Sequence, residues 1–235
     1  MGINQRSAGD PGFFVTGTDT GAGKTLVASA LLRAFAHSGL RAVGMKPVAT
    51  GCRAEAHDRA NEDVAALLAA SNVHAAIDLV NPYCFEPAIA PHLAAQQAGC
   101  SISLAHIRDC YLALAGLADR VVVEGAGGLL VPLGPREDWG DLVKLLDLPV
   151  VLVVGMRLGC LNHALLTAEA IGSRGLPFAG WVANRIDPDM PYFEDNVETL
   201  RRKLPAPLIG IMPFAPDDAE AFAAMNTGMM ITQNP

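Results

Sequence analysis

The stretch Phe13–Thr25, FFVTGTDTGAGKT, constrains the fold more than any other part of the sequence. A short apolar run is followed by a glycine-rich turn and by a Lys–Thr pair, which opens a helical pattern over Leu26–Ser38. These parts in this order form a phosphate-binding loop, because the backbone N–H groups and the helix dipole present positive charge to a polyphosphate. Five residues, rather than the usual four, separate Gly17 from Gly23, so Thr18 stands at the first position of the strict pattern.

The rest of the chain alternates strand patterns with helix patterns. Continuous apolar runs such as that in Arg120–Gly128 are typical of strands buried on both faces. The alternation predicts an α/β fold of the P-loop NTPase type, with a doubly wound, mostly parallel sheet and helices on both faces. Pro47 cannot donate to a ladder, so we expect a strand to end there and Val48–Arg53 to form a loop. The other expected strands are 40–48, 81–85, 149–155, 178–184 and 208–213, and the expected helices are 61–71, 87–99, 103–118, 138–146, 161–173 and 192–204.

Length and composition limit the domain organisation and the partners. The 235 residues are 51% hydrophobic, and we expect one domain over residues 12–235 after a disordered tail, Met1–Pro11. A net charge of −7 without a Lys/Arg cluster argues against nucleic acid as a partner, and no apolar run is long enough for a membrane helix. The five cysteines are odd in number and show no C-x-x-C pair. We therefore expect reduced thiols in a cytoplasmic protein.

Polar residues stand at the ends of several expected strands. Lys46, Glu124 and Asn184 each close one strand, and the phosphate-binding loop closes another. Ligands of doubly wound sheets bind at the C-terminal strand ends, so we expect these residues to converge on one active site. Taken one at a time, these residues also allow interpretations other than an active site. Lys46 could end its strand in solvent. Asp63 could lie in the first turn of a helix only because the helix dipole favours an acidic residue there.

The ordered motifs together resemble those of dethiobiotin synthetases. The phosphate-binding loop has that family's extra residue, and the likeness continues in blocks to about residue 214. The resemblance implies an ATP- and Mg²⁺-dependent ligase of biotin biosynthesis. In that reaction 7,8-diaminononanoate takes up CO₂ as a carbamate, ATP phosphorylates the carbamate, and the second amine closes the cyclic urea of dethiobiotin. The further blocks are KPVATG (46–51), NPY (81–83), PH (91–92), VEGAGG (123–128), LGCLNHA (158–164), GWVAN (180–184) and PAPL (205–208).

The resemblance also implies roles for the residues at matching positions. Lys24 and Lys46 would be the catalytic residues that neutralise charge on the transferred phosphoryl group. Oxygen ligands for Mg²⁺ would come from Thr25, Asp63 and Glu124. The substrate would be held by Lys46, Thr50, Gly159, Cys160, Leu161 and Asn162, and the nucleotide by Gly21, Ala22, Gly23, Lys24, Thr25, Leu26, Asp63, Glu124, Gly125, Ala126, Gly127, Asn184, Arg185, Pro213, Phe214, Ala215 and Glu220.

A homodimer with shared active sites follows from the same resemblance. Residues 159–162 of one subunit would hold the substrate carboxylate beside the phosphate-binding loop of the other, and this stretch opens a helix whose backbone N–H groups favour an anion. The chain departs from the family at two positions. Gly21 stands where members often carry Glu, and Asn196 stands where the family places a tyrosine, with Tyr192 about one helical turn upstream.

Two other classes share the α/β core. A regulatory ATPase of the partition or division-site type would carry a lysine five residues before Lys24, where this chain has Asp19. Its membrane-binding relatives end in a basic amphipathic helix, whereas Met225–Pro235 contains no Lys or Arg. An amide-forming synthetase of the cobyrinic-acid type usually carries a glutaminase domain, for which we expect 235 residues to be too few.

Overall fold

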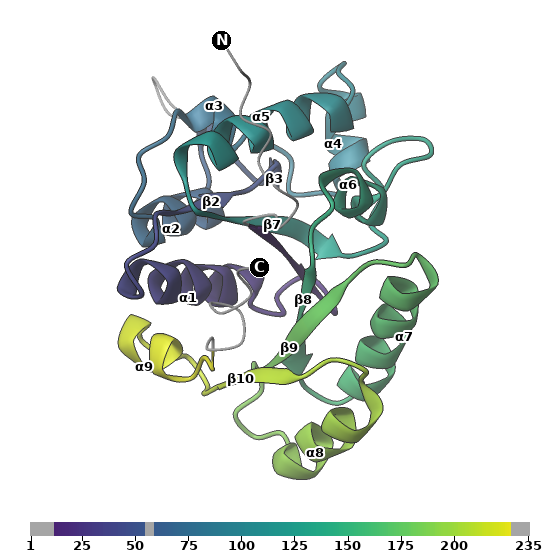
Figure 1. Ribbon diagram of the computed structural model, residues 1–235. Coiled ribbons are helices and arrows are strands. Elements are labelled where there is room, and N and C mark those ends of the chain that lie inside the picture. Colours follow the sequence, from purple (N-terminus) through teal and green to yellow (C-terminus); the bar gives the residue numbers. More distant parts are fainter. Residues whose placement is uncertain (1–11, 55–58, 227–235) are drawn as a thin grey trace.

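A parallel sheet forms the centre of the molecule. The computed structural model describes residues 12–54 and 59–226 (Figure 1). Six strands pair in the order β10-β9-β8-β1-β7-β2, and each of these pairings is parallel. The predicted doubly wound fold is therefore confirmed. The strands are β1 (Gly12–Gly17), β2 (Ala42–Met45), β7 (Arg120–Gly128), β8 (Val150–Met156), β9 (Phe178–Arg185) and β10 (Leu208–Met212).

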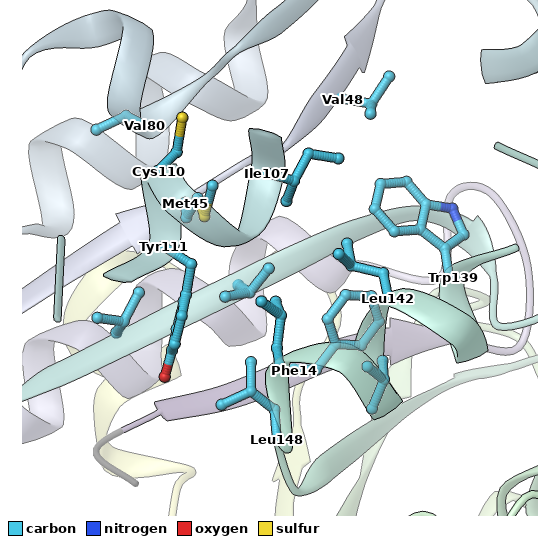
Figure 2. Packing of buried hydrophobic residues seen from close by; sticks show 14 of the residues in the cluster. Phe14, Met45, Val48, Val80, Ile107, Cys110, Tyr111, Trp139, Leu142 and Leu148 are labelled. Carbon is cyan, nitrogen blue, oxygen red and sulfur yellow. The ribbon is translucent and has the colours of Figure 1, made fainter. Parts of the chain in front are cut away.

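Helices cover both faces of this sheet. Alternate side chains of β1 point to opposite faces: Phe13 stacks on Phe35 of the first helix, whereas Phe14 contacts Trp139 in the other core cluster (Figure 2). Both faces are buried, which is why the strands are apolar without alternation. One face carries α1 (Lys24–His37), α2 (Glu62–Ala70) and α9 (Asp218–Ala223), and the other carries α5 (Leu104–Leu117), α6 (Trp139–Leu146), α7 (Cys160–Ser173) and α8 (Phe193–Lys203).

A smaller layer lies beyond β2. The stretch after Pro47 is not the expected loop, because Val48–Thr50 forms β3 and pairs in parallel with β6 (Tyr83–Phe85). Pro47 has no N–H to donate, but its carbonyl oxygen accepts a hydrogen bond from the backbone N–H of Tyr83. The chain therefore continues as a second strand after the proline. The other elements of this layer are β4 (Arg53–Ala54), β5 (Arg59–Ala60), α3 (Ile77–Val80) and α4 (Pro91–Gln97).

Most predicted elements are present, with shifted ends. The helix expected over 87–99 begins only at Pro91, a position in the first turn where a missing N–H costs nothing. The short elements α3, β4, β5 and α9 were not predicted. The tail Met1–Pro11 lies outside the described residues, and among the described helices none is long and apolar enough to cross a membrane.

The expectation of five reduced cysteines is wrong for two of them. Cys52 and Cys84 form a disulfide with a Cα–Cα distance of 6.0 Å, although 32 residues separate them in the sequence. The β3–β6 pairing brings them together, because it places Ala49 opposite Cys84 and Cys52 N donates to Phe85 O at 2.9 Å. The free cysteines of the described chain are Cys100, Cys110 and Cys160.

Candidate active site

The phosphate-binding loop connects β1 to α1. Gly21 and Gly23 have φ values of 77° and 89°, in the left-handed region that glycine adopts without strain. Behind the loop, Asn184 at the end of β9 donates from Nδ2 to the carbonyl oxygen of Ala22 at 2.8 Å. The same amide occupies the space that a Cβ at position 23 would need. The loop is therefore fitted closely against the neighbouring strand end.

Lys24 is the first residue of α1 and is only 7% exposed. Its Nζ donates to the carbonyl oxygen of Asp19 at 3.1 Å, so the side chain folds back along the loop. The Asp19 carboxylate is held in turn by Arg157 at 2.6 Å. Burial, and next the positive charge of Lys46, lower the pKa of Lys24. The acidic groups near Lys24 thus do not offset the effects of burial and of Lys46, and a bound polyphosphate would supply further negative charge to stabilise the ammonium.

Four predicted residues from four elements meet beside this lysine. Thr25 donates from Oγ1 to Asp63 Oδ1 at 2.9 Å and lies 2.8 Å from Glu124 Oε1. Lys46 Nζ donates to Asp63 Oδ2 at 2.8 Å and to Glu124 Oε1 at 2.5 Å. Lys46 is buried at the end of β2, so the solvated interpretation of this lysine is wrong. The convergence expected for strand ends of a parallel sheet is present here.

The donor set of this cluster fits a magnesium ion completed by a nucleotide. Glu124 is fully buried, and its Oε2 has no hydrogen-bond partner among the described residues. A buried carboxylate oxygen without a partner is costly unless a cation satisfies it. Two carboxylates and the Thr25 hydroxyl, together with phosphate oxygens, form the oxygen set that Mg²⁺ prefers. The described residues contain no group of three or more His, Cys, Asp or Glu that could hold a metal by itself.

Charges in the cluster shift one another's protonation. Burial opposes the Lys46 ammonium, but the carboxylates of Glu124 and Asp63 outweigh it and raise the pKa of Lys46. Burial also opposes the Asp63 carboxylate, yet Lys46 outweighs it and lowers the pKa of Asp63. For Glu124, burial dominates and raises the pKa despite the contact with Lys46. The two carboxylates therefore favour the charged form of Lys46, while their own pKa values shift in opposite directions.

A cavity of about 370 Å³ opens beside Asp63, and Thr50 and Gly51 form part of its wall. Asn61 joins this wall to the cluster of Thr25, Lys46, Asp63 and Glu124. Its Oδ1 accepts from the backbone N–H groups of Asp63 and Val64 at the start of α2, and its Nδ2 donates to Thr50 O at 3.2 Å. One side chain thus links the cavity to the helix that carries Asp63.

The remaining predicted nucleotide residues divide into two groups. Asn184 lies against the loop, Gly125 O accepts from Lys46 Nζ at 3.4 Å, and a Cβ at Gly127 would lie 3.7 Å from Thr20 Oγ1. Ala126 O accepts from Trp139 Nε1 instead, and Arg185 packs over the Phe193 ring at 4.5 Å. The turn Pro213–Ala215 is exposed beyond β10. Glu220 accepts from the backbone N–H of the residue that caps α9, in a capping box. The geometry therefore gives Glu220 a helix-capping contact, which is the structural use of its carboxylate.

Residues 159–162 form the start of α7, where Gly159 has a φ of 97° and Asn162 is exposed. None of these four residues lines the 370 Å³ cavity. Tyr192 is the N-cap of α8, with a φ of 55° and 77% of its surface exposed. Asn196, at the family's tyrosine position, donates from Nδ2 to Tyr192 O at 2.7 Å. Asn196 thus holds the backbone of Tyr192, and the tyrosine ring is open to solvent.

Comparison with known proteins identifies the family. A family model described as "AAA domain" matches residues 11–220. The ATP-dependent dethiobiotin synthetase BioD of Nitrosospira multiformis is 56% identical over 203 residues, which cover 86% of this chain and 88% of that protein. The enzyme of the same name from Aromatoleum aromaticum is 54% identical over 201 residues, covering 86% and 89%. The chain belongs to the dethiobiotin synthetase family.

Membership of the dethiobiotin synthetase family confirms the predicted resemblance and enzyme class, an ATP-dependent ligase that forms C–N bonds. It does not favour the regulatory ATPase or the amide synthetase. Solved structures share the P-loop fold: a chain of the MinC:MinD cell division protein complex of Aquifex aeolicus has a TM-score of 0.55 at 17% identity, covering 92% of this chain and 87% of that chain. The Mg-ADP complex of MinD from Pyrococcus horikoshii has a TM-score of 0.51 at 16% identity, covering 91% and 86%.

Two residues of this dethiobiotin synthetase site were not predicted. Asn61 had a readable signal, because an asparagine before a Glu–Asp pair is typical of a helix N-cap. Its second bond, to Thr50, joins separate elements and has no local signal. Arg157 follows β8 and reaches Asp19 only because β8 pairs with β1. That contact depends on strand order, which no local pattern encodes.

Proposed function

We propose that this chain converts 7,8-diaminononanoate, CO₂ and ATP into dethiobiotin, ADP and phosphate. The observation that carries the proposal is the buried Lys46, which joins Asp63 and Glu124 beside the P-loop residue Thr25. A carbamate and a γ-phosphoryl group are both anionic, and a reaction between them needs fixed positive charge at their meeting point. Lys46 supplies that charge on the cavity side, and Lys24 supplies it on the phosphate side.

The nucleotide lies, in this proposal, along the loop and over the start of α1. Backbone N–H groups of residues 21–26 face its phosphates, and Asn184 stands beside the loop toward the base. Thr25, Asp63 and Glu124 hold Mg²⁺, which supplies charge neutralisation on the phosphates when bound. Support comes from the convergence of the three side chains and from the unpartnered Glu124 Oε2.

The diamine occupies the cavity walled by Thr50 and Gly51, which places its reacting amines near Lys46 and Asp63. Its carboxylate is held by Gly159, Cys160, Leu161 and Asn162 of a second subunit, since these residues do not line the cavity of their own chain. The proposal therefore includes a homodimer with shared sites. Residues 12–235 form one domain of a cytoplasmic enzyme, without nucleic-acid or membrane partners.

A coupled assay of ADP formation tests the reaction. With diaminononanoate, bicarbonate and Mg·ATP together we expect steady ADP release, and omission of the diamine should remove it. The dethiobiotin product is identified by mass spectrometry. ADP release that ignores the diamine but responds to a partner protein or to lipid would contradict the proposal and support a regulatory ATPase.

A further inference from the structure

A second cavity, of about 590 Å³, brings three of the five cysteines to one place. Its lining includes both partners of the disulfide, Cys52 and Cys84, and the exposed free thiol of Cys100. The two disulfide residues are only 4% and 8% exposed, so this cavity is their route to solvent. A volume of this size lies within the range of small-molecule sites.

The disulfide crosses the β3–β6 pair next to the proposed diamine pocket. Cys52 comes two residues after Thr50, and its backbone N–H is bonded to Phe85 O. Gly51 N donates to Pro87 O at 3.3 Å, so the chain at the pocket wall is bonded both to β6 and to the segment that follows β6. Each of these strands has only three residues, and so short a pair is weak without further support. The covalent bond supplies that support.

A continuous set of contacts leads from the disulfide to the proposed magnesium site at Thr25, Asp63 and Glu124. Thr50 O accepts from Asn61 Nδ2, and Asn61 caps the helix that carries Asp63. Asp63 in turn contacts Lys46 and Thr25. A shift of Thr50 therefore changes the shape of the diamine pocket directly, and it changes the nucleotide site only through Asn61 and Asp63.

We propose that the second cavity is a thiol–disulfide exchange site, where a low-molecular-weight thiol opens the Cys52–Cys84 bond and loosens the diamine pocket. This inference rests on the proposed function for the identity of that pocket. Disulfides are rare in reducing compartments, and those present are usually redox-active. The cross-link belongs to a buried core cluster, but both of its cysteines also line the cavity beside the proposed diamine pocket.

The exchange proceeds in two displacements. The thiolate of the small molecule attacks one cysteine sulfur, a mixed disulfide forms, and the Cys52–Cys84 bond breaks. The departing sulfur keeps the electron pair of that bond and takes up a proton. A second thiolate then attacks the small-molecule sulfur of the mixed disulfide, which forms a bond between the two small thiols and releases the remaining cysteine as a thiolate that takes up a proton. Two thiol molecules thus supply the two electrons and leave joined to each other.

The test compares oxidised and reduced protein with dithiothreitol and glutathione as the probes. Alkylation in denaturant, followed by mass spectrometry, should show two additional thiols, Cys52 and Cys84, after millimolar thiol. In the coupled assay the reduced protein should have a KM for the diamine at least about five-fold higher, the lower end of usual coupling factors. The KM for ATP should change by less than about two-fold, because the nucleotide lies at the far end of the contacts.

Two variants separate this route from other thiols. The double variant Cys52→Ser/Cys84→Ser should have the high KM in either buffer. The matched control Cys110→Ser, at a free cysteine that does not line this cavity, should respond as wild type does. Fully reduced wild-type protein with an unchanged KM overturns the proposal, and so does a thiol response that survives in the double variant. If the diamine drives no ADP release in either state, the proposed function fails instead. In that case alkylation still tests the exchange site. A Cys52–Cys84 bond that resists millimolar thiol overturns the exchange site, and a bond that opens supports it.

Discussion

Lys46 illustrates how the environment of a single residue decides its role. In the sequence it is a lysine before a proline, and lysines are rarely buried unless paired. In the structure its ammonium lies between carboxylates from α2 and β7. Its membership of the site was predictable, because strand ends of a parallel sheet share one edge. Its two ion pairs were not, because they join residues 17 and 78 positions apart.

Replacing Lys46 with methionine should lower kcat by about 10² or more, the usual loss for one charge stabiliser of a transition state. Methionine keeps much of the length and removes the charge. Steady-state kinetics with the diamine measure the effect, and thermal unfolding checks the fold. Lys203→Met, on the exposed last turn of α8, is the matched control and should be unchanged. A rise in the diamine KM alone would make Lys46 a binding residue without a catalytic role.

Glu124→Gln keeps the side-chain shape but removes the charge proposed to meet Mg²⁺. We expect the Mg²⁺ concentration for half-maximal rate to rise about 10-fold or more, a loss seen even for outer partners of metal sites. A magnesium titration at saturating ATP measures it. Asp109→Asn, an exposed carboxylate on α5, should leave the titration unchanged. Identical titrations for Glu124→Gln and wild type would exclude Glu124 from the metal site.

At the scale of elements, prediction succeeded where the signal is local. The buried strands β7, β8 and β9 are continuous apolar runs, and their ends were predicted to within two residues. The β3–β6 pair and the Cys52–Cys84 bond were missed because their partners are distant in sequence. Helix α9 was missed although Asp217 and Glu220 have the spacing of a capping box.

One contact between elements should make a measurable contribution to the free energy of unfolding. Arg174, after α7, bonds both oxygens of Asp138, the N-cap of α6, at 2.9 and 2.5 Å. It lies so close that a Cβ at Gly140 would meet its Nη1 at 2.7 Å. Arg174→Ala should reduce the free energy of unfolding by about 1–2 kcal/mol, the range for charge-assisted hydrogen bonds. Urea denaturation measures this. Arg201→Ala, which breaks an exposed pair within α8, should cost less than about 0.5 kcal/mol. Equal losses for the two variants would show that the Arg174–Asp138 bonds add no more stability than an exposed ion pair does.

At the scale of the whole molecule, the catalytic cluster and the start of α7 are separate features of one chain. The cluster gathers α1, β2, α2 and β7, whereas α7 follows β8 (Figure 1). No local pattern specifies whether a second copy joins them, because closure of a shared site depends on surfaces and symmetry. The dimer is therefore a prediction that only an experiment on paired subunits can test.

Two inactive variants should restore activity when mixed. Lys24→Ala removes the charge at the phosphates, and Asn162→Asp places a negative charge beside the proposed carboxylate site. After subunit exchange at equal amounts, half of the dimers are mixed and each has one intact site, so activity should reach about a quarter of wild type. Native mass spectrometry confirms exchange, and each variant alone is the control. Exchange without activity would show that each site belongs to one subunit.

The close contact between Gly23 and Asn184 limits which substitutions these two positions can accept during evolution. Two independent constraints act on position 23, its left-handed backbone and the amide that fills the space beside it. Position 184 has constraints of its own, the bond to Ala22 O and the place beside the base in the proposed function. A smaller residue at 184 would relieve the overlap but not the backbone strain of a side chain at 23. The dependence between the two positions is therefore one-sided: a substitution at 184 does not free position 23 to vary, because the left-handed backbone still favours glycine there.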